Sequence, residues 1–252
     1  MTMRFLRGVA LLAALFSATP VLALDNGCLL DHCEDKAPPT AAAPPSDAAP
    51  TQRMTRPRFG PSASASGEFD FYVLALSWSP GFCELSGGGR SQCEPGARLG
   101  FVVHGLWPQY EHGFPSNCGG SPTVSRMALD RAKGVYPDDG LARYEWRKHG
   151  TCTGLSPGDY FDSVARAKSL VTIPQNFQNF SADQTFATQD VERAFIEANP
   201  RLRPGMMSVG CQRGLLQEVR ICVTKDLRDF RACPEVARGG CHSREIRATA
   251  PY

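Results

Sequence analysis

The sequence predicts an α+β fold in which helices pack on a central antiparallel sheet and disulfides stabilise the domain. Helical patterns gather in the middle of the folded region, and apolar runs typical of strands lie on either side of them. This segregation favours α+β over the strand–helix alternation of a parallel α/β fold. The chain also has ten cysteines among its 252 residues, which are enough for five crosslinks.

The N-terminus has the features of a secretory signal peptide. Arg4 and Arg7 precede an apolar run over Val9–Phe16, and Val21–Ala23 offers the residues that a signal peptidase favours. We expect residues 1–23 to be removed by cleavage after Ala23, so that the protein is secreted or periplasmic. In an exported protein the cysteines are mostly paired in disulfides.

The sequence argues against a membrane-bound protein. The N-terminal apolar run is too short to span a bilayer, and no later segment approaches the roughly 20 apolar residues of a spanning helix. A lipid anchor at Cys28 is the alternative, but Asp25–Gly27 before it fits such a signal poorly, so we expect no membrane anchor. The formal charge of +2 is too small to indicate a nucleic-acid partner by itself.

Residues 24–67 are expected to form a small cysteine loop followed by a flexible linker. Cys28 and Cys33 flank four residues and favour a local disulfide, since a metal site would need more ligands than this segment offers. From Glu34 to Gly67, Pro, Ala, Ser and Thr dominate, and this composition cannot bury enough apolar surface to fold. The folded domain is therefore assigned to residues 68–252.

Two buried strands are expected to open this domain. Phe69–Trp78 is a near-continuous apolar run bounded by the turn-like Ser79–Gly81, and Leu99–Val103 is a second run. The second strand is expected to end at His104. A histidine just beyond a buried strand is held on a rigid element, which suits a catalytic group. The alternative is a core histidine whose nitrogens are satisfied by the backbone.

Helices are expected next, followed by further strands. The helical patterns cover about Val124–Lys133, Leu141–His149, Ser156–Leu170 and Thr188–Asn199. The later strands are Met206–Cys211 and Leu215–Thr224, separated by a turn at Gln212–Gly214. In the last strand Glu218 and Arg220 fall on one parity, as in a half-buried strand. The other parity carries apolar residues, namely Leu215, Val219, Ile221 and Val223.

The helix that ends near residue 149 gathers chemically useful side chains. Glu145, Lys148 and His149 share one face, because residues three and four apart lie side by side on a helix. Gly150 follows where a left-handed C-cap is expected. An acid, an ammonium and an imidazole together could stabilise a charged transition state and move a proton. The alternative is a solvated helix face with an ordinary Glu–Lys pair and an idle histidine.

Two segments of the sequence resemble the paired active-site signatures of the ribonuclease T2 family. They are Phe101–Pro108, which reads FVVHGLWP, and Glu145–Cys152, which reads EWRKHGTC and follows about forty residues later. The family comprises secreted endoribonucleases of fungi, plants, animals and bacteria. The resemblance covers residues 68–252, implies a ribonuclease T2-like fold there, and leaves the first 67 residues unexplained.

The resemblance also implies a disulfide pattern that uses every cysteine. A bridge from Cys118 to Cys152 would tie the two signatures together. The other pairs are Cys83–Cys93, Cys211–Cys241, Cys222–Cys233 and the local Cys28–Cys33. A disulfide of this kind contributes about 2–4 kcal/mol to stability, and the bridge between the signatures would also fix side-chain geometry.

By resemblance, the protein cleaves single-stranded RNA by transesterification. The ribose 2′-hydroxyl attacks phosphorus to give a 2′,3′-cyclic phosphate, which is hydrolysed more slowly to a 3′-phosphate. The resemblance implies His149 as the base, His104 as the acid, Lys148 as the group that stabilises the phosphorane, and Glu145 as a group that orients the phosphate. Histidine titrates in the range that both proton transfers need. No metal or cofactor is implied, DNA lacks the nucleophile and should not be cut, and a monomer is expected.

Three positions concern substrate binding. Tyr144 stands where many family members have a phosphate-binding histidine, so we expect an altered affinity or pH profile. Trp107 could stack on a base, with plain core packing as the alternative. Gln109 occupies a place where some members carry an acid that reads the base, and Tyr110 and Phe114 are weaker candidates in the same loop.

Two other classes of function are compatible with parts of the sequence. A secreted RNA-binding or signalling protein could keep this fold without turnover, although both histidines are present. A disulfide-rich adhesion or inhibitor module would instead use the N-terminal loop and linker. Digestion of yeast RNA in EDTA, compared with His104→Ala and His149→Ala variants, separates both alternatives from an enzyme.

Overall fold

The computed structural model describes residues 66–86, 89–178 and 181–251. The expected signal peptide, the Cys28–Cys33 loop and nearly all of the expected linker lie outside the described residues. None of the described helices has the length and apolar character that crossing a membrane requires.

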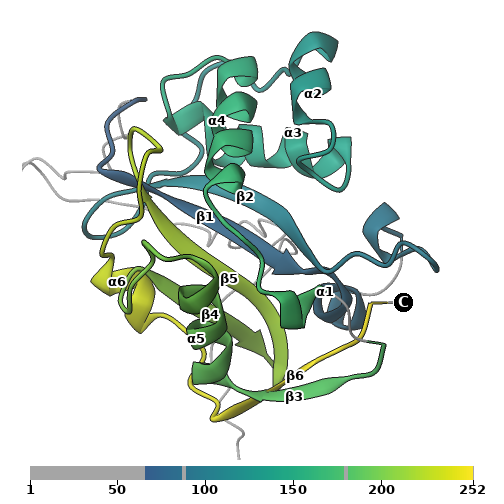
Figure 1. Ribbon diagram of the computed structural model, residues 1–252. Helices are drawn as coiled ribbons and strands as arrows, with labels where there is room; N and C mark the ends of the chain where they lie inside the picture. Colours follow the sequence, from purple (N-terminus) through teal and green to yellow (C-terminus); the bar gives the residue numbers. More distant parts are fainter. Residues whose placement is uncertain (1–65, 87–88, 179–180, 252) are drawn as a thin grey trace, which may run out of the picture. The chain divides into compact units, whose positions relative to one another are not determined.

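A six-stranded sheet forms the centre of the domain (Figure 1). Its strands are β1 (Phe71–Trp78), β2 (Phe101–Gln109), β3 (Gln184–Ala187), β4 (Met207–Gln212), β5 (Leu215–Thr224) and β6 (Glu245–Ala248). Their order is β2–β1–β5–β6–β3, with β4 paired to β5 off this path. The described pairings are antiparallel except for one parallel contact between β5 and β6. The α+β prediction is confirmed, and the short strands β3 and β6 were not foreseen.

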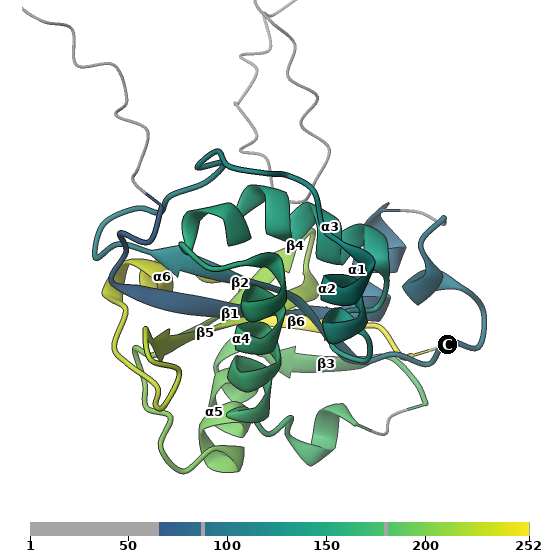
Figure 2. The same ribbon diagram turned by 90° about the horizontal axis from the view of Figure 1, so that it is seen from above.

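The helices form two groups beside the sheet (Figures 1 and 2). The group next to β1 and β2 consists of α2 (Arg126–Ala132), α3 (Asp139–Lys148) and α4 (Pro157–Ser169). Helix α5 (Thr188–Ala198) instead packs on β4. The shorter helices are α1 (Ser79–Ser86), α6 (Pro234–Arg238) and the 3₁₀ turns η1 (Ser91–Cys93), η2 (Gly150–Cys152) and η3 (Gln175–Phe177).

Side-chain caps define where the three helices of the first group begin. Ser125, Asp138 and Ser156 accept hydrogen bonds from backbone N–H groups three residues later. A cap of this type stabilises a helix by about 1 kcal/mol because it satisfies a donor that has no partner within the helix. The expected helices are therefore present with small changes at their ends. The start of helix α1 was wrongly predicted to be a turn. The proline there is compatible with a helix, because proline is tolerated in the first helical turn.

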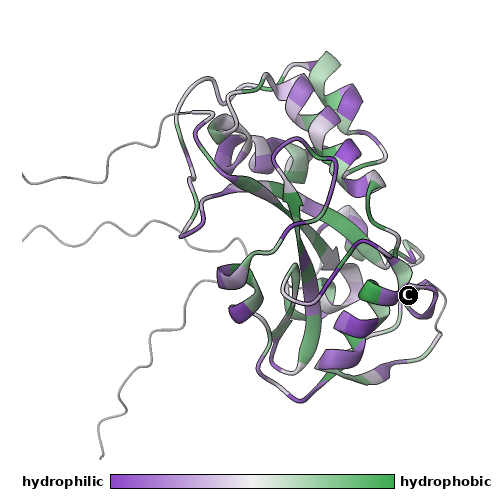
Figure 3. Cartoon of the chain, turned by 60° about the vertical axis from the view of Figure 1, so that its left-hand side comes forward, coloured by the Kyte–Doolittle hydropathy of each residue, from purple (hydrophilic) through white to green (hydrophobic). Residues whose placement is uncertain are grey.

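The hydrophobic core lies against one face of the sheet. Tyr72, Leu74, Leu76 and Trp78 alternate along β1 and are all buried within the main apolar cluster. Hydrophobic residues follow the strands, while the helices carry hydrophilic residues on their outer turns (Figure 3). Burying a side chain such as leucine contributes about 1.5–3 kcal/mol, so this face supplies much of the driving force for folding.

Four disulfides crosslink the described residues. They are Cys83–Cys93, Cys118–Cys152, Cys211–Cys241 and Cys222–Cys233. These are four of the five pairs that the family resemblance implies, and the fifth lies outside the described residues. Two of the bridges join segments at least 30 residues apart in the chain, where loop closure restricts the unfolded chain most.

Candidate active site

His104 lies at a bulge within β2. In the pairing of β1 with β2, Ala75 faces Gly105 and Leu76 faces Val103, so His104 is the extra residue on β2. A bulge bends its strand and redirects the side chain of the extra residue. The expectation that the strand ends at His104 was wrong, because β2 continues through the signature to Gln109.

The C-terminal end of α3 presents the second set of candidate residues. Glu145 lies in its last turns, Lys148 is its final residue, and His149 is its C-cap, whose N–H donates to the Glu145 carbonyl at 2.9 Å. Gly150 is not the left-handed cap that we expected; it begins the 3₁₀ turn η2 instead. A glycine is needed there because a Cβ atom would lie 2.3 Å from a ring carbon of Trp146.

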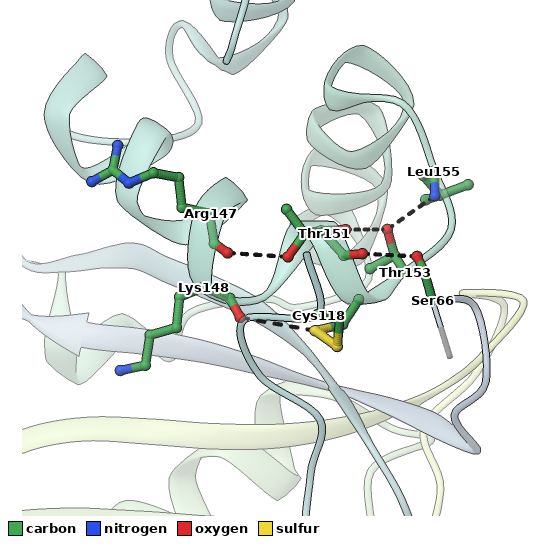
Figure 4. Close-up of a disulfide and its surroundings, with 9 residues drawn as sticks. Ser66, Cys118, Arg147, Lys148, Thr151, Thr153 and Leu155 are labelled. Atoms are coloured by element: carbon green, nitrogen blue, oxygen red, sulfur yellow. Dashed lines mark hydrogen bonds between the residues drawn. A yellow bond between two sulfur atoms is a disulfide. The ribbon is translucent and has the colours of Figure 1, made fainter. Parts of the chain in front are cut away.

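The Cys118–Cys152 disulfide and several hydrogen bonds fix the chain after α3 (Figure 4). Thr151 Oγ1 donates to the Arg147 carbonyl at 3.0 Å, and Ser66 Oγ donates to the Thr151 carbonyl at 2.8 Å. The side chains of Arg147 and Lys148 leave the helix end in different directions. The disulfide and these hydrogen bonds therefore fix the backbone that follows Lys148 and His149.

Glu145 connects the two signatures. Its side chain is 1% exposed, its Oε2 accepts a 2.8 Å hydrogen bond from Trp107 Nε1, and its Oε1 lies 3.6 Å from His104 Nε2. Gly105 makes this approach possible, since a Cβ atom there would lie 1.9 Å from Glu145 Oε2. A charged carboxylate buried in this way depends on such hydrogen bonds and on nearby positive charge.

The indole of Trp107 contacts both candidate histidines. Its ring centroid is 5.2 Å from that of His104 and 5.3 Å from that of His149. The guanidinium carbon of Arg220 lies 5.5 Å from the same indole, at the distance of a cation–π contact. Trp107 thus supports both imidazoles from within the protein, in addition to binding Glu145.

Lys148 and Tyr144 form a pair on the partly exposed side of α3. Lys148 Nζ donates to the Tyr144 hydroxyl at 2.9 Å and lies 5.2 Å from the centre of its ring. The tyrosine therefore holds the ammonium in position without adding a charge. A positively charged group can stabilise an anion, and imidazoles can accept and donate protons.

Glu218 and Arg220 on β5 complete the site, and the sequence analysis assigned neither of them to it. Glu218 Oε2 lies 3.5 Å from His104 Nδ1, and Glu218 Oε1 accepts from Arg220 Nε at 2.7 Å. The prediction that β5 is a half-buried strand was wrong at Glu218, because this residue is only 4% exposed. Burial raises the pKa of the Glu218 carboxyl, but the His104 and Arg220 side chains together lower it below its usual value.

The candidate base-binding residues at the end of β2 and in the loop after it differ in exposure. Gln109 is buried where β2 ends, and Tyr110 is half-buried. Phe114 is instead 59% exposed, which is unusual for a large apolar side chain on this protein. Of these residues, Phe114 has the most ring surface open to a ligand.

The sequence is similar to those of known ribonucleases. The model of the ribonuclease T2 family matches residues 69–233. A ribonuclease of Aeromonas hydrophila is 36% identical over 177 residues, covering 68% of this chain and 79% of that protein. Intracellular ribonuclease LX of Solanum lycopersicum is 28% identical over 198 residues, covering 69% of this chain and 81% of that protein.

Solved structures show the same fold. Ribonuclease MC1 from the seeds of bitter gourd superposes with a TM-score of 0.56 at 20% identity, covering 71% of this chain and 99% of that one. At this identity the likeness concerns the fold alone. The family match, however, spans both signatures and the strand that carries Glu218. The chain therefore belongs to the ribonuclease T2 family.

Proposed function

We propose that this protein is an endoribonuclease that cleaves single-stranded RNA by transesterification. The 2′-hydroxyl of the ribose attacks the adjacent phosphorus and forms a 2′,3′-cyclic phosphate, which water then opens to a 3′-phosphate. The observation that carries the proposal is the convergence of His104 and His149 on one indole, with Glu145 and Lys148 beside them. Two imidazoles are what a reaction with one proton accepted and one proton donated requires.

Each side chain has a role that follows from its position. His149, held at the end of α3, accepts the proton of the 2′-hydroxyl, and His104 donates a proton to the leaving 5′-oxygen. Lys148 stabilises the negative charge that develops on the phosphorane, as a cation aimed at the transition state does in other phosphoryl transfers. Glu145 orients His104 and the phosphate, since its carboxylate accepts a hydrogen bond from Trp107 and faces the His104 ring.

The proposal includes export, a monomeric state and independence from metals. The N-terminal sequence has the features of a signal peptide, and four disulfides suit an oxidising compartment such as the periplasm or the extracellular space. The two imidazoles suffice for both proton transfers, so the chemistry needs no metal. DNA lacks the 2′-hydroxyl and should remain intact.

Digestion of yeast RNA in EDTA tests this function. We expect wild type to release acid-soluble nucleotides, and His104→Ala and His149→Ala to lose about 10²–10⁴-fold of that activity, the range typical of general acid–base groups. His242→Ala is a matched control, because His242 is exposed and lies in a loop near α6, away from both signatures. No product from folded wild-type protein would favour the RNA-binding alternative, and full activity of either active-site variant would refute the assigned roles.

Base binding is proposed at the loop after β2. An exposed aromatic ring can stack on any base, and such stacking contributes about 1–3 kcal/mol per base. We assign this role to Phe114, whereas Trp107 and Gln109 act mainly by supporting the site, because they are more buried. Digestion of the four RNA homopolymers should show a KM increase in Phe114→Ala with little change in kcat. An unchanged KM on all four would exclude stacking on Phe114.

A further inference from the structure

We propose that Glu218 is a positioning residue for His104, holding the Nδ1–H of the imidazole so that Nε2 faces the reacting phosphate. This inference rests on the proposed function and extends the site to β5, which lies outside both signatures. Two carboxylates lie close to the nitrogens of the His104 ring, Glu145 Oε1 at 3.6 Å from Nε2 and Glu218 Oε2 at 3.5 Å from Nδ1.

The strand register explains how two side chains from non-neighbouring strands meet. Strand β1 lies between β2 and β5, with Ala75 opposite both Gly105 and Arg220 and with Ser77 opposite Glu218. Paired residues of an antiparallel sheet point to the same face. Because the β1 residues on this face are small at these two positions, the side chains from β2 and β5 can reach across it. The bulge at His104 then directs the imidazole toward Glu218.

The Glu218 carboxylate is held in one orientation. Arg220 binds Oε1 through Nε at 2.7 Å and Nη2 at 2.5 Å, which leaves Oε2 directed at the imidazole. Gly210, which pairs with Glu218 on β4, leaves room for this conformation, since a Cβ atom there would lie 2.8 Å from Glu218 Cγ. Three features therefore converge on one carboxylate: a fork of guanidinium donors, a glycine opposite and an imidazole.

A purely structural ion pair would not need this arrangement. Arg220 and Glu218 are two residues apart on one strand and could pair at the surface, yet the Glu218 side chain is 5% exposed and the Arg220 side chain 29%. Burying a carboxylate is costly unless its partners compensate for the lost water. Because that carboxylate lies next to the candidate general acid, we attribute its burial to the positioning of His104.

In the proposed step one proton moves from His104 to the leaving oxygen, and none moves to Glu218. His104 in its protonated form carries hydrogens on both ring nitrogens, donates the one on Nε2 to the leaving 5′-oxygen, and keeps the one on Nδ1, which points at Glu218. Glu218 itself neither gains nor loses a proton. This is the logic by which a buried carboxylate orients a catalytic histidine and stabilises its charged form. The low pKa of the Glu218 carboxyl keeps it ionised at neutral pH.

The groups around His104 decide the sign of the expected pH effect. Glu145 and Glu218 favour the protonated imidazole, whereas Arg220, bound to Glu218, opposes it. The His149 ring lies 5.3 Å from the Trp107 indole, which the His104 ring also contacts. Glu218→Gln removes a negative charge at nearly constant shape, so the pKa of His104 should fall. The alkaline limb of kcat/KM, which reports the loss of the proton from the general acid, should then move to lower pH by about 1 unit.

The decisive experiment compares wild type, Glu218→Gln and Glu192→Gln by NMR titration of the His104 imidazole and by the pH profile of RNA cleavage. Glu192 is a matched control because it is half-buried on α5 and lies away from His104. We expect the pKa of His104 and the alkaline limb to fall together in Glu218→Gln alone. An unshifted His104 pKa in folded Glu218→Gln would overturn the proposal, even if activity were lower.

The nitrogen chemical shifts of wild-type His104 provide a test that needs no variant. We expect the neutral imidazole to carry its hydrogen on Nδ1, and a hydrogen on Nε2 instead would overturn the proposal. Both NMR measurements are independent of turnover. A wild-type protein that does not cleave RNA would therefore refute the proposed function, while the contact between Glu218 and His104 would still be tested.

Discussion

The two faces of the central sheet show how one set of strands serves two purposes. On one face, β1 presents Tyr72, Leu74, Leu76 and Trp78 to the main apolar cluster. On the other face, the same strand presents Ala75 and Ser77 beneath the side chains of the candidate site. Large apolar residues fill the first face. The second face has a smaller apolar cluster around Phe71 and Val73, and beside it the small Ala75 and Ser77 leave space for the candidate site.

Burial has different causes on the two faces of the sheet. Residues on the core face are buried because apolar surface leaves water, which is non-directional and tolerant of exchange. Glu145, Glu218 and His104 are buried as strongly, but their burial is sustained by specific partners. Substitutions on the core face should therefore change stability first, and those on the site face should change chemistry as well.

Leu74→Ala should have the largest effect on stability. Leu74 is fully buried between Leu106 on β2 and Ile221 on β5, so the variant should lose about 2–5 kcal/mol of unfolding free energy in urea. The activity of each folded molecule should remain near that of wild type. Leu155→Ala is the control, since Leu155 is exposed. A stable Leu74→Ala protein with impaired cleavage would contradict the claim that residues of the core face act mainly on stability.

Trp107→Phe should lower both activity and stability. The change removes the Nε1 donor from a buried carboxylate, and a hydrogen bond to a charged group contributes about 1.5–3 kcal/mol. Trp146→Phe is a matched control, because it loses a neutral hydrogen bond to the Ser121 carbonyl without touching either imidazole. We expect kcat/KM to fall much further in Trp107→Phe than in Trp146→Phe, and equal losses would argue against a support role for the indole.

Gly105→Ala should disturb the site through a single methyl group. The added Cβ would meet the Glu145 carboxylate and the Trp107 nitrogen, and such overpacking costs about 1–3 kcal/mol. Gly239→Ala provides the comparison, since its nearest atoms lie at 3.6 Å, an ordinary contact distance. The Tm of thermal unfolding and kcat/KM should both decrease in Gly105→Ala but not in Gly239→Ala. Wild-type kinetics in that variant would mean that the position of Glu145 does not matter.

Tyr144→His should have the smallest effect. The hydroxyl of Tyr144 accepts from Lys148 and lies at the partly exposed edge of the site, so a histidine there should change KM more than kcat, with the change largest below pH 6.5, where histidine is charged. Tyr144→Phe separates loss of the hydroxyl from gain of a charge. A fall in kcat that exceeds the change in KM would assign Tyr144 to the chemical step instead.

Much of the fold could be predicted because its signals are local. Two examples are the apolar run of β1 and the helical spacing of Glu145, Lys148 and His149, which each depend on neighbours in the sequence. Helix α1 and the short strands β3 and β6 were missed because their formation depends on contacts that no local pattern encodes. The end of β2 was misjudged because a glycine and a proline in the signature suggested that the strand stops.

The candidate site was predictable only in part. The histidines could be found from their signatures, but Glu218 could not, because a charged residue that alternates with apolar ones has the pattern of a solvent-facing position. Its burial depends on small residues of the neighbouring strand β1 and on a bulge in β2, the strand beyond it. A strand register is a tertiary property, so the sequence of β5 alone does not contain it.

The central claim, that two imidazoles act on one phosphodiester through an internal nucleophile, can be tested by following the cleavage of a ribodinucleotide in EDTA by phosphorus NMR. The account predicts a 2′,3′-cyclic phosphate that accumulates first and a 3′-phosphate that replaces it later, with neither signal in His104→Ala or His149→Ala at matched protein concentration. Direct formation of a 5′-phosphate by the wild-type protein, with no cyclic intermediate, would contradict it.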